Sequence, residues 1–420
     1  MNLKRRLERL AGAAPSAAPV PTAPPQSEPR PLDDLRRQMA ALLGREPPRV
    51  EGFPPRRAPG ALGVRDLPFR TRETESGLLW QRRERLAPAH RVGRVGIDAL
   101  GSADPRVLSQ LALDPRVGAC APSSWLFIDT ETTGLGGAGA LVFLIGMAAI
   151  EDGEVVVEQL LLAEPKDERA LLERLRERVA GASLLVSFNG KAFDRPMLDA
   201  RVVLNRQRAL PERPHLDLLH VGRRLHRQRL GRCTLKRVER DVLGFDRGED
   251  VDGSEVAAIY SHYLRSADAT GLNAVVAHNF WDVVSMVALV ALYGQRTPPL
   301  QGQDMACLAR TLGRAGATEH AERVADIACE RGGGAEAYRV RAELAKSRGD
   351  SSSAVRDFEQ LCREADDPSG RLELAKLYEH KLRQPAHALR WLEQGTNEDC
   401  AAHSRRRERL ERKLRREPTP

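Results

Sequence analysis

The sequence predicts an α/β domain with a mixed sheet flanked by helices, followed by an all-α domain of helical repeats. Two observations lead to this fold class. From Trp125 onward, short apolar runs separated by turns alternate with stretches of helical periodicity. Over the last 120 or so residues only helical patterns occur, and they repeat. Three strands joined by turns, then alternating helices and strands, favour a mixed sheet with an antiparallel edge.

The elements of the first domain follow in order along the chain. WLFIDTE, ALVFLIGMAAI and EVVVEQLLLA predict three strands, with Asp152-Gly153 as the turn between the last two. Residues 166–179 predict a helix from their periodicity and alternating charges. SLLVSFN predicts a fourth strand and HLDLLH a short fifth, on either side of a helix beginning at Asp194. The remaining predicted helices of this domain cover 221–230, 234–243, 253–264 and 271–293.

The C-terminal helical patterns repeat with a period near 34. The small residues Ala321, Ala354 and Ala388 occupy equivalent places in three aligned segments, 33 and 34 positions apart. This period with paired helices is typical of tetratricopeptide repeats, and three units are about the minimum for a stable stack. Most signature aromatic residues are missing, so an ordinary helical bundle is the alternative.

Composition divides the chain into five parts. Residues 1–60 are rich in Pro, Ala and Arg and predict a disordered leader, because such a segment buries too little apolar surface to offset its ordering entropy. Residues 61–122 form an extension whose order the pattern leaves open, either a flexible arm or a small unit packed on the next domain. The α/β domain is placed at 123–296 and the repeats at 300–400. Residues 401–420 are a basic tail or merely a solvated charged face.

Charge and cysteine usage narrow the class of protein. The net charge of +8 favours a polyanionic partner, although nucleotide bias in a genome also produces an Arg- and Ala-rich composition. The six cysteines form no C-x-x-C pair, which argues against a zinc ribbon or disulfide framework and indicates a cytoplasmic protein. No secretory signal is predicted, and no run of about 18 apolar residues predicts a membrane span.

The stretch 134–139 matches the G-x-G-x-x-G pattern of a dinucleotide-binding loop. Such a loop must lead from a strand into a helix, whose N-terminus meets the pyrophosphate. Here the glycines lead into ALVFLIG, which has no polar face at helical spacing and predicts a strand. The sequence therefore argues against a dinucleotide site, and no nucleotide cofactor is expected.

Just before these glycines, Asp129 and Glu131 are two residues apart at the end of an apolar run. Residues i and i+2 of a strand point to one face, so the two carboxylates project together. Crowded carboxylates favour a cation, and hard oxygen ligands select magnesium or manganese. Taken alone, D-x-E at a strand end is more simply a solvated pair.

Two further stretches carry acids with the same kind of ambiguity. In SFNGKAFD, Asp194 follows a strand and a glycine turn at the start of a helix, where it would ordinarily be an N-cap. In HNFWD, His278 and Asp282 are four residues apart and share a helix face, ordinarily a polar stripe.

Together, FIDTETTG, SFNGKAFD and HNFWD, in this order, resemble the DEDD exonuclease superfamily, also called DnaQ-like or ribonuclease-H-like. The combination is specific, while each motif alone is not, and the resemblance covers about Trp125 to Tyr293. The longer stretches HLDLLHVGRRL, TLKRVERDVLGFDR and HNFWDVVSMVAL are most similar to the YprB-type branch, whose members can also carry helical repeats after the nuclease-like domain. The expected sheet is therefore ribonuclease-H-like.

The resemblance implies a site of four acids, Asp129, Glu131, Asp194 and Asp282, holding two Mg²⁺ or Mn²⁺ ions that clamp the scissile phosphate. It also implies that His278 orients or deprotonates the attacking water, a role that suits a neutral imidazole. The superfamily has a tyrosine type with three residues between this position and the last acid, and a histidine type with four. This chain has histidine at the tyrosine spacing, so the ring could lie differently from either arrangement.

Charge suggests where substrate binds. Between Arg201 and Arg240 there are twelve Arg or Lys and three acids, a net charge of +9 by subtraction, which favours a phosphate track over an ordinary solvated face. Asn189 and Phe193 are candidates to contact the 3′ end, and Thr132 and Gly134 could place donors near the terminal nucleotide. The cations proposed to contact substrate are Arg223, Arg224 and Lys236, with Arg227, Arg229, Arg232 and Arg237 along the same helices. Asp217, between His215 and His220, is expected to be structural rather than a metal ligand.

The leading hypothesis is a metal-dependent 3′–5′ exonuclease acting on DNA or RNA 3′ ends. The alternative is a nucleic-acid-binding adaptor with a nuclease-like fold and protein-binding repeats, and the third hypothesis is a repeat scaffold that binds a peptide in a helical groove. The repeats make a protein partner a further possibility, and no membrane partner is expected.

Overall fold

The computed structural model describes residues 62–134 and 140–416. The predicted leader at 1–60, most of the glycine stretch and the last four residues lie outside the described residues. Both neighbours of the glycine stretch are strands, β5 (Trp125–Thr132) and β6 (Val142–Glu151), as the sequence predicts. The chain thus passes from a strand into a strand at this point, whereas a dinucleotide loop leads into a helix.

A seven-stranded mixed sheet forms the centre of the α/β domain, with strand order β1-β2-β7-β6-β5-β8-β9. The pairs from β1 to β5 are antiparallel, and β5, β8 and β9 run parallel. Asp152 and Gly153 both have positive φ in the turn between β6 and β7, as a two-residue hairpin requires. The remaining strand bounds are β1 Arg70–Thr74, β2 Gly77–Leu86, β7 Glu154–Leu161, β8 Leu184–Ser187 and β9 His215–Asp217.

The N-terminal extension contributes two strands that the sequence did not predict. β1 and β2 form a hairpin, and β2 continues the sheet by pairing with β7 from Trp80↔Leu161 to Leu86↔Val155. The segment GLLWQRRERL was missed because its charged half shows no apolar alternation. The rest of the extension contains a small hairpin of β3 (Arg91–Val92) and β4 (Val95–Gly96) and the helix α3 (Pro105–Ala112).

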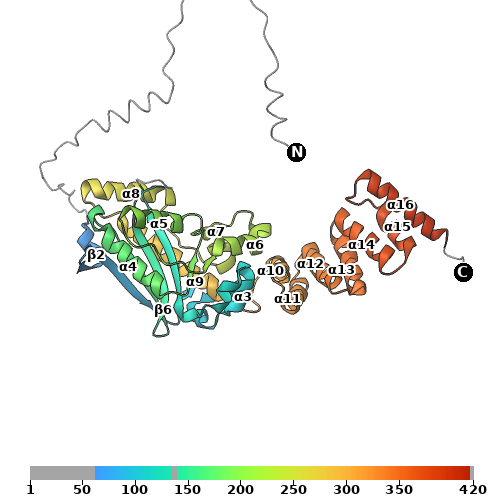
Figure 1. The fold of residues 1–420 in the computed structure, drawn as a ribbon, viewed down its shortest axis with the longest axis horizontal. Helices are drawn as coiled ribbons and strands as arrows, with labels where there is room; N and C mark the ends of the chain where they lie inside the picture. The colour runs from blue at the N-terminus through green and yellow to red at the C-terminus, as the bar shows by residue number, and fades with distance from the viewer. Residues whose placement is uncertain (1–61, 135–139, 417–420) are drawn as a thin grey trace, which may run out of the picture. The chain divides into compact units, whose positions relative to one another are not determined.

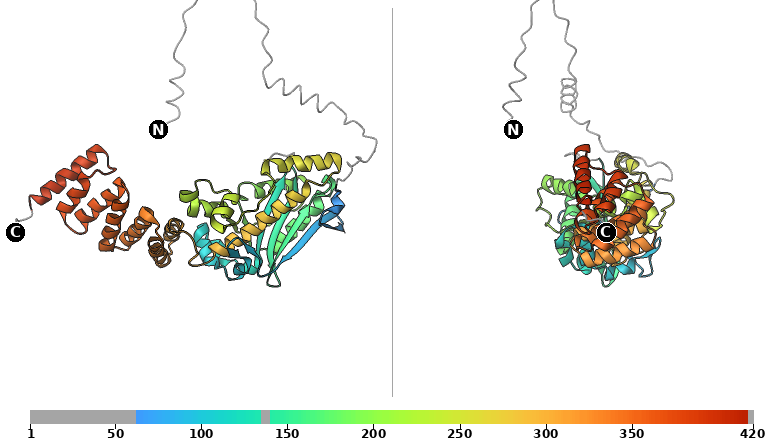
Figure 2. Two further views of the ribbon diagram at one scale, coloured as in Figure 1. Left: turned by 180° about the vertical axis from the view of Figure 1, so that it is seen from behind. Right: turned by 90° about the vertical axis from the view of Figure 1, so that its right-hand side faces the viewer.

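Helices cover both faces of the sheet (Figures 1 and 2). On one face the long helix α9 (Leu272–Tyr293) contacts β5, β6 and β7. On the other face α4 (Glu168–Gly181), α5 (Asp194–Leu204) and α8 (Gly253–Ser266) share one apolar cluster with the strands. Within the described residues α9 is the only helix apolar and long enough to cross a membrane, and 83% of its apolar window is buried, as in a core helix.

Helices also follow the sheet along the chain. The predicted strand HLDLLH is a strand only at His215–Asp217, because the Asp217 carboxylate caps the helix α6 (Leu218–Leu230) that starts directly after it. A short helix α7 (Leu235–Val238) continues into a π-helical turn at Glu239–Leu243.

The C-terminal region is a series of helical hairpins. The helices are α10 Gly302–Arg314, α11 Thr318–Glu330, α12 Gly334–Ser347, α13 Ser351–Glu364, α14 Pro368–His380, α15 Pro385–Glu393 and α16 Cys400–Leu414. Ala321, Ala354 and Ala388 are fully buried in the second helix of successive hairpins, which explains why small residues repeat there. The tetratricopeptide assignment and the domain limits remain predictions.

Candidate active site

Asp129 and Glu131 lie near the end of β5, on the face of the sheet that α9 covers. Their neighbours Ile128 and Thr130 are buried toward the opposite face, as strand alternation requires. Asp129 is directly opposite Gly146 of β6. The two predicted carboxylates therefore reach the space between the sheet and α9.

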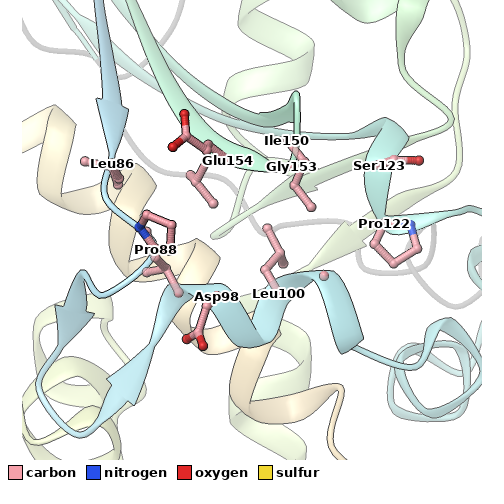
Figure 3. A pocket seen from close by; sticks show the side chains of 12 residues that line it. Leu86, Pro88, Asp98, Leu100, Pro122, Ser123, Ile150, Gly153 and Glu154 are labelled. Carbon is pink, nitrogen blue, oxygen red and sulfur yellow. The ribbon is translucent and has the colours of Figure 1, made fainter.

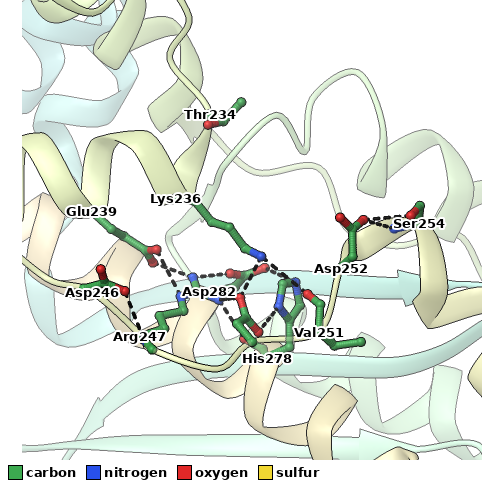
Figure 4. Close-up of polar contacts among 12 residues, drawn as sticks. Thr234, Lys236, Glu239, Asp246, Arg247, Val251, Asp252, Ser254, His278 and Asp282 are labelled. Carbon is green, nitrogen blue, oxygen red and sulfur yellow. Dashed lines mark hydrogen bonds and ion pairs between the residues drawn. The ribbon is translucent and has the colours of Figure 1, made fainter.

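Helix α9 places His278 and Asp282 in the same space between the helix and the sheet. The two residues are one turn apart, and His278 Nε2 lies 3.5 Å from an Asp282 carboxylate oxygen. Ligand atoms of Glu131, His278 and Asp282 all lie within 4.8 Å of one another. Figure 4 shows His278 and Asp282 converging from α9. This group joins a strand and a helix about 150 residues apart in sequence.

Asp194 is held slightly apart from this group. It is buried at the first residue of α5, and Thr130 Oγ1 donates a hydrogen bond of 2.5 Å to its carboxylate. Its negative charge nevertheless raises the pKa values of Asp129 and Glu131. All four predicted acids thus influence one another electrostatically. Only Glu131, His278 and Asp282 have ligand atoms close enough together to contact one ion among the described residues.

The acids at the sheet end are poorly compensated. Burial, followed by the charges of Asp282, Asp194 and Glu131, raises the pKa of Asp129 well above its ordinary value. Burial raises the pKa of Glu131 to about 7 against the opposing effect of His278, and burial raises that of Asp194 to about 6. Crowded carboxylates that are half-buried, as Asp129 and Glu131 are, or buried, as Asp194 is, fit a divalent ion with oxygen ligands.

A loop that the sequence analysis did not single out completes the site. The Arg247 guanidinium is buried and forms ion pairs with both Glu239 and Asp282 (Figure 4). Asp250 lies 2.7 Å from His278 Nδ1 and 2.9 Å from Lys236 Nζ. Burial opposes ionisation of Asp250, but Lys236 and His278 outweigh it and lower its pKa. The sequence offers two signals for it, the YprB-like stretch TLKRVERDVLGFDR, which contains Arg247, and the charged run GFDRGED.

Asn279, which the sequence presents only as part of the HNFWD motif, contacts a predicted acid. Its Nδ2 donates to an Asp129 carboxylate oxygen at 2.9 Å, and its side chain is fully buried. Its place on α9, between His278 and Phe280, could not reveal this contact because the helix orientation decides it.

The predicted substrate residues separate into two groups. Asn189 and Arg223 line an open cleft of about 780 Å³ next to the turn that leads to Asp194. Arg224 donates to the Leu111 carbonyl oxygen, and Lys236 is engaged with Asp250. The other cleft residues are Phe188, Leu219, Arg227, Gly231, Arg232, Cys233, Thr234 and Leu235.

Three further predicted residues lie beside the acids. Thr132 is the last residue of β5 and donates its hydroxyl to the Gly134 carbonyl oxygen, which orders the chain after the acids. Phe193 directly precedes α5 and is half-buried.

Asp217 has a structural role in this geometry. Its carboxylate accepts hydrogen bonds from the backbone N–H groups of Asn189, Lys191 and Leu219. These bonds join the turn before Asp194 to the start of α6, so Asp217 holds one wall of the cleft. Its oxygens are occupied by donors, in agreement with the structural expectation.

A second hollow of about 340 Å³ lies at the far end of the β6–β7 hairpin (Figure 3). Leu86, Pro88, Leu100 and Ile150 give it an apolar lining, with Asp98 and Glu154 at its edge. It contains none of the predicted site residues.

Comparisons with known proteins identify the family of the α/β domain. The model of the RNase H superfamily matches residues 126–293. The chain is 32% identical over 301 residues to an uncharacterized protein, YprB, from Bacillus subtilis (strain 168), covering 68% of this chain and 72% of the relative. A family B DNA polymerase structure from the hyperthermophilic archaeon Pyrobaculum calidifontis is similar over 53% of this chain and 29% of its own, with 16% identity and a TM-score of 0.34. That last likeness is too low to carry an argument. The matched family confirms the predicted ribonuclease-H-like fold.

Proposed function

We propose that this chain, which belongs to the YprB family and carries an RNase H superfamily domain, is a divalent-metal-dependent 3′–5′ exonuclease. The superfamily supports cleavage of nucleic acid, and the polarity and the metal requirement are our proposal. The observation that carries it is the convergence of Glu131, His278 and Asp282 within 4.8 Å, beside the uncompensated Asp129.

The proposed ligands are the four acids. Asp129, Glu131, Asp194 and Asp282 would hold two Mg²⁺ or Mn²⁺ ions, as the raised pKa values of the first three and the carboxylate oxygens of all four favour. When bound, such ions supply positive charge to the phosphate oxygens and make water a better nucleophile at neutral pH.

His278 is proposed as the proton acceptor for the attacking water. Its Nδ1 lies 2.7 Å from the Asp250 carboxylate, which can only accept when ionised, so the proton belongs on Nδ1. The lone pair of His278 Nε2 then points toward the Asp282 carboxylate. Asp250 orients the imidazole, which supports the base role although His278 has the tyrosine-type spacing.

The cleft beside Asn189 is proposed to hold the nucleotides next to the scissile bond. Arg223, Arg227 and Arg232 are exposed in it and have no ion-pair partner among residues 62–134 and 140–416. Phe188 offers an aromatic edge in the same cleft. Unpaired arginines beside an aromatic residue suit a single strand, whose phosphates and bases are both accessible.

The test is degradation of 5′-labelled single-stranded DNA and RNA oligonucleotides with Mn²⁺ or Mg²⁺. The wild type should shorten one of them from the 3′ end, and Asp129→Ala/Glu131→Ala should not. Asp152→Ala/Glu154→Ala is the matched control, because it removes the same residue types at the same spacing from the exposed β6–β7 turn. Internal cuts instead of a 3′ ladder would replace the exonuclease by an endonuclease.

One observation favours the second candidate function, a nucleic-acid-binding adaptor. Arg247 already neutralises Asp282 from within the chain, which weakens the need for an external ion at that carboxylate. In the adaptor, oligonucleotides bind and neither metal produces cleavage. Titration of the wild type with Mn²⁺ separates the two functions, because the exonuclease should bind the ion and the adaptor should not.

A further inference from the structure

Four residues on neighbouring strands form a continuous row across the sheet beneath α9. Arg82 of β2 is in register with Gln159 of β7, Gln159 with Gly146 of β6, and Gly146 with Asp129 of β5. Period-two alternation places all four on the α9 face. Asn279 of α9 bridges the place of the glycine, where no side chain is available.

Hydrogen bonds run along this row without a break. Arg82 Nη1 donates to Gln159 Oε1 at 2.9 Å. Gln159 Nε2 donates to the Val276 carbonyl oxygen and to Asn279 Oδ1, each at 2.9 Å. Asn279 Nδ2 donates to Asp129 Oδ2 at 2.9 Å. Gln159 and Asn279 are 1% and 0% exposed, so water cannot substitute for a missing bond.

The direction of every bond follows from the chemistry of the two ends. Arginine can only donate and a backbone carbonyl can only accept. Gln159 must therefore turn its oxygen to Arg82 and its NH₂ group to Val276 and Asn279. Asn279 in turn must present its oxygen to Gln159 and its NH₂ group to Asp129. Rotation by 180° would break three hydrogen bonds of the Gln159 amide or two of the Asn279 amide, so the network fixes both amide assignments.

Gly146 makes the bridge possible. A Cβ atom at this position would overlap the Asn279 side-chain oxygen and lie 2.8 Å from Val283 Cγ2. Any side chain at position 146 would push α9 away from the sheet, and with it the residues His278 and Asp282. Position 146 therefore requires glycine for steric reasons, and not because of its backbone conformation.

We propose that Arg82, Gln159 and Asn279 are positioning residues that form a one-way hydrogen-bond relay to Asp129, holding its carboxylate in the rotamer that binds a divalent cation. The relay rests on the proposed function in naming the cation. One oxygen of Asp129 is occupied by Asn279, and the other is left for a ligand. The N-terminal hairpin, through Arg82, thereby becomes part of the metal site although two strands, β7 and β6, separate it from β5.

Arg82 is well placed to start the relay because its own position is determined by neighbours. It forms an ion pair with Glu84 and lies over the Phe280 ring, 5.2 Å from the centroid. Phe280 follows Asn279 on α9, so the arginine clamps the helix turn that carries the amide. Its side chain is 23% exposed, so a substitution there disturbs the core least.

The first experiment measures Mn²⁺ affinity of the full chain by calorimetry. Asn279→Leu should weaken binding by about 10- to 100-fold, as loss of a partner that orients a metal ligand commonly does. Gln159→Met and Arg82→Met should weaken it by successively smaller factors. Arg83→Met is the matched control, because it removes the same charge from the next residue of β2, which pairs with Glu151 instead. Equal affinity for Arg82→Met, Gln159→Met and wild type would overturn the relay.

Gln159→Glu distinguishes positioning from simple electrostatics. An added carboxylate near the site should strengthen cation binding if charge alone matters. In the relay it removes both donors, so Asn279 must turn its oxygen toward Asp129. Weaker Mn²⁺ binding than in Gln159→Met supports the relay, and stronger binding overturns it.

A metal-free readout separates the relay from the proposed function. In protein selectively labelled with ¹⁵N-asparagine, the Asn279 NH₂ resonances should exchange slowly with solvent and should shift in Gln159→Met. They should be unchanged in Arg83→Met. If wild type binds no Mn²⁺ but the amide behaves in this way, the nuclease proposal fails and the relay stands. An unprotected Asn279 amide in the wild type overturns the relay itself.

Discussion

Two groups of buried carboxylates in this chain have opposite electrostatic surroundings. In the C-terminal helices, the buried Glu379 receives ion pairs from Arg406, Arg409 and Lys413 of α16. Burial alone would raise the pKa of Glu379, but hydrogen bonds from Arg409 and Lys413 outweigh it and lower the pKa to about 2. At the end of the sheet, burial and mutual repulsion instead raise the pKa of Glu131 to about 7.

The contrast shows how a structural carboxylate differs from one kept for a ligand. The chain supplies several cations to Glu379, which fastens α16 to α14. Among residues 62–134 and 140–416, one arginine or lysine, Arg247, forms an ion pair with the four acids at the sheet end, and it reaches only Asp282. A carboxylate that is shielded from water and has no cationic partner is costly, so the persistence of such a group points to function. Substitutions in the two groups should therefore have opposite effects on stability.

The largest effect is expected from Asp129→Asn/Glu131→Gln. Cleavage should fall by on the order of 10³-fold or more, because a metal clamp supplies several kcal/mol of transition-state stabilisation. The metal-free protein should become more stable, since two repelling carboxylates are neutralised. Activity assays and thermal melting with and without Mn²⁺ measure both. A Mn²⁺-induced rise in melting temperature equal to that of wild type would contradict the ligand assignment.

Glu379→Gln should act in the opposite way. It leaves Arg406, Arg409 and Lys413 without their shared carboxylate and should cost about 3 kcal/mol of unfolding free energy. Denaturant unfolding followed by circular dichroism measures the loss. Glu411→Gln, which breaks only the half-exposed pair with Arg407, should cost less than about 0.5 kcal/mol. Equal costs for the two variants would show that the Glu379 group is not special.

The two groups should also respond to pH in opposite directions. Glu379 has a lowered pKa, so its contribution is present above its ordinary value of 4.5 and is lost as pH falls toward 2. Glu131 and Asp194 have raised pKa values of about 7 and 6, so their contribution is complete below about pH 4 and is lost as pH rises through 6 and 7.

The metal-free wild type should therefore lose on the order of 1–2 kcal/mol relative to Glu131→Gln between pH 5 and pH 8. Over the same range, stabilisation by Mn²⁺ should grow, because binding displaces protons from the carboxylates. Unfolding titrations of both proteins at several pH values, with and without Mn²⁺, give the two curves. Parallel curves for wild type and Glu131→Gln would place the pKa of Glu131 near its ordinary value.

The sequence predicted the acids of the site much better than their surroundings. Period-two alternation and turn residues identified β5, β6 and β7, and the order of three motifs identified Asp129 and Asp282 as partners. Arg82 was missed because GLLWQRRERL carries charges on both faces, which only the pairing with β7 and the cover of α9 explain. Asp250 was missed because a loop contact with His278 has no sequence period. The order of motifs can be read from the sequence, whereas long-range contacts are set only by the tertiary fold.

The arginines of α6 show the same limit within one helix. The sequence treats Arg224, Arg227 and Arg229 alike, but packing decides what each one meets. Arg229 pairs with the buried Asp304 of α10, and Arg224 donates to the Leu111 carbonyl oxygen. Arg227 faces the open cleft. Spacing along a helix tells how its side chains are directed relative to one another. Only the tertiary fold determines which neighbours each side chain contacts.

The smallest effect is expected from Arg227→Gln, which extends the comparison from anions to cations. Like Asp129, Glu131 and Asp194, Arg227 has no ion-pair partner in the part of the chain that the structure describes, and it should meet a phosphate. Affinity for single-stranded oligonucleotide should fall only a few-fold, and the slope of log K against log salt should fall by about 0.7, the value for one phosphate contact. Arg237→Gln removes the same charge from a neighbouring helix, but Arg237 is paired with Asp241 and should leave the slope nearly unchanged. If both substitutions lower the slope equally, the cleft has no special role and substrate binding follows the overall basic charge of the domain.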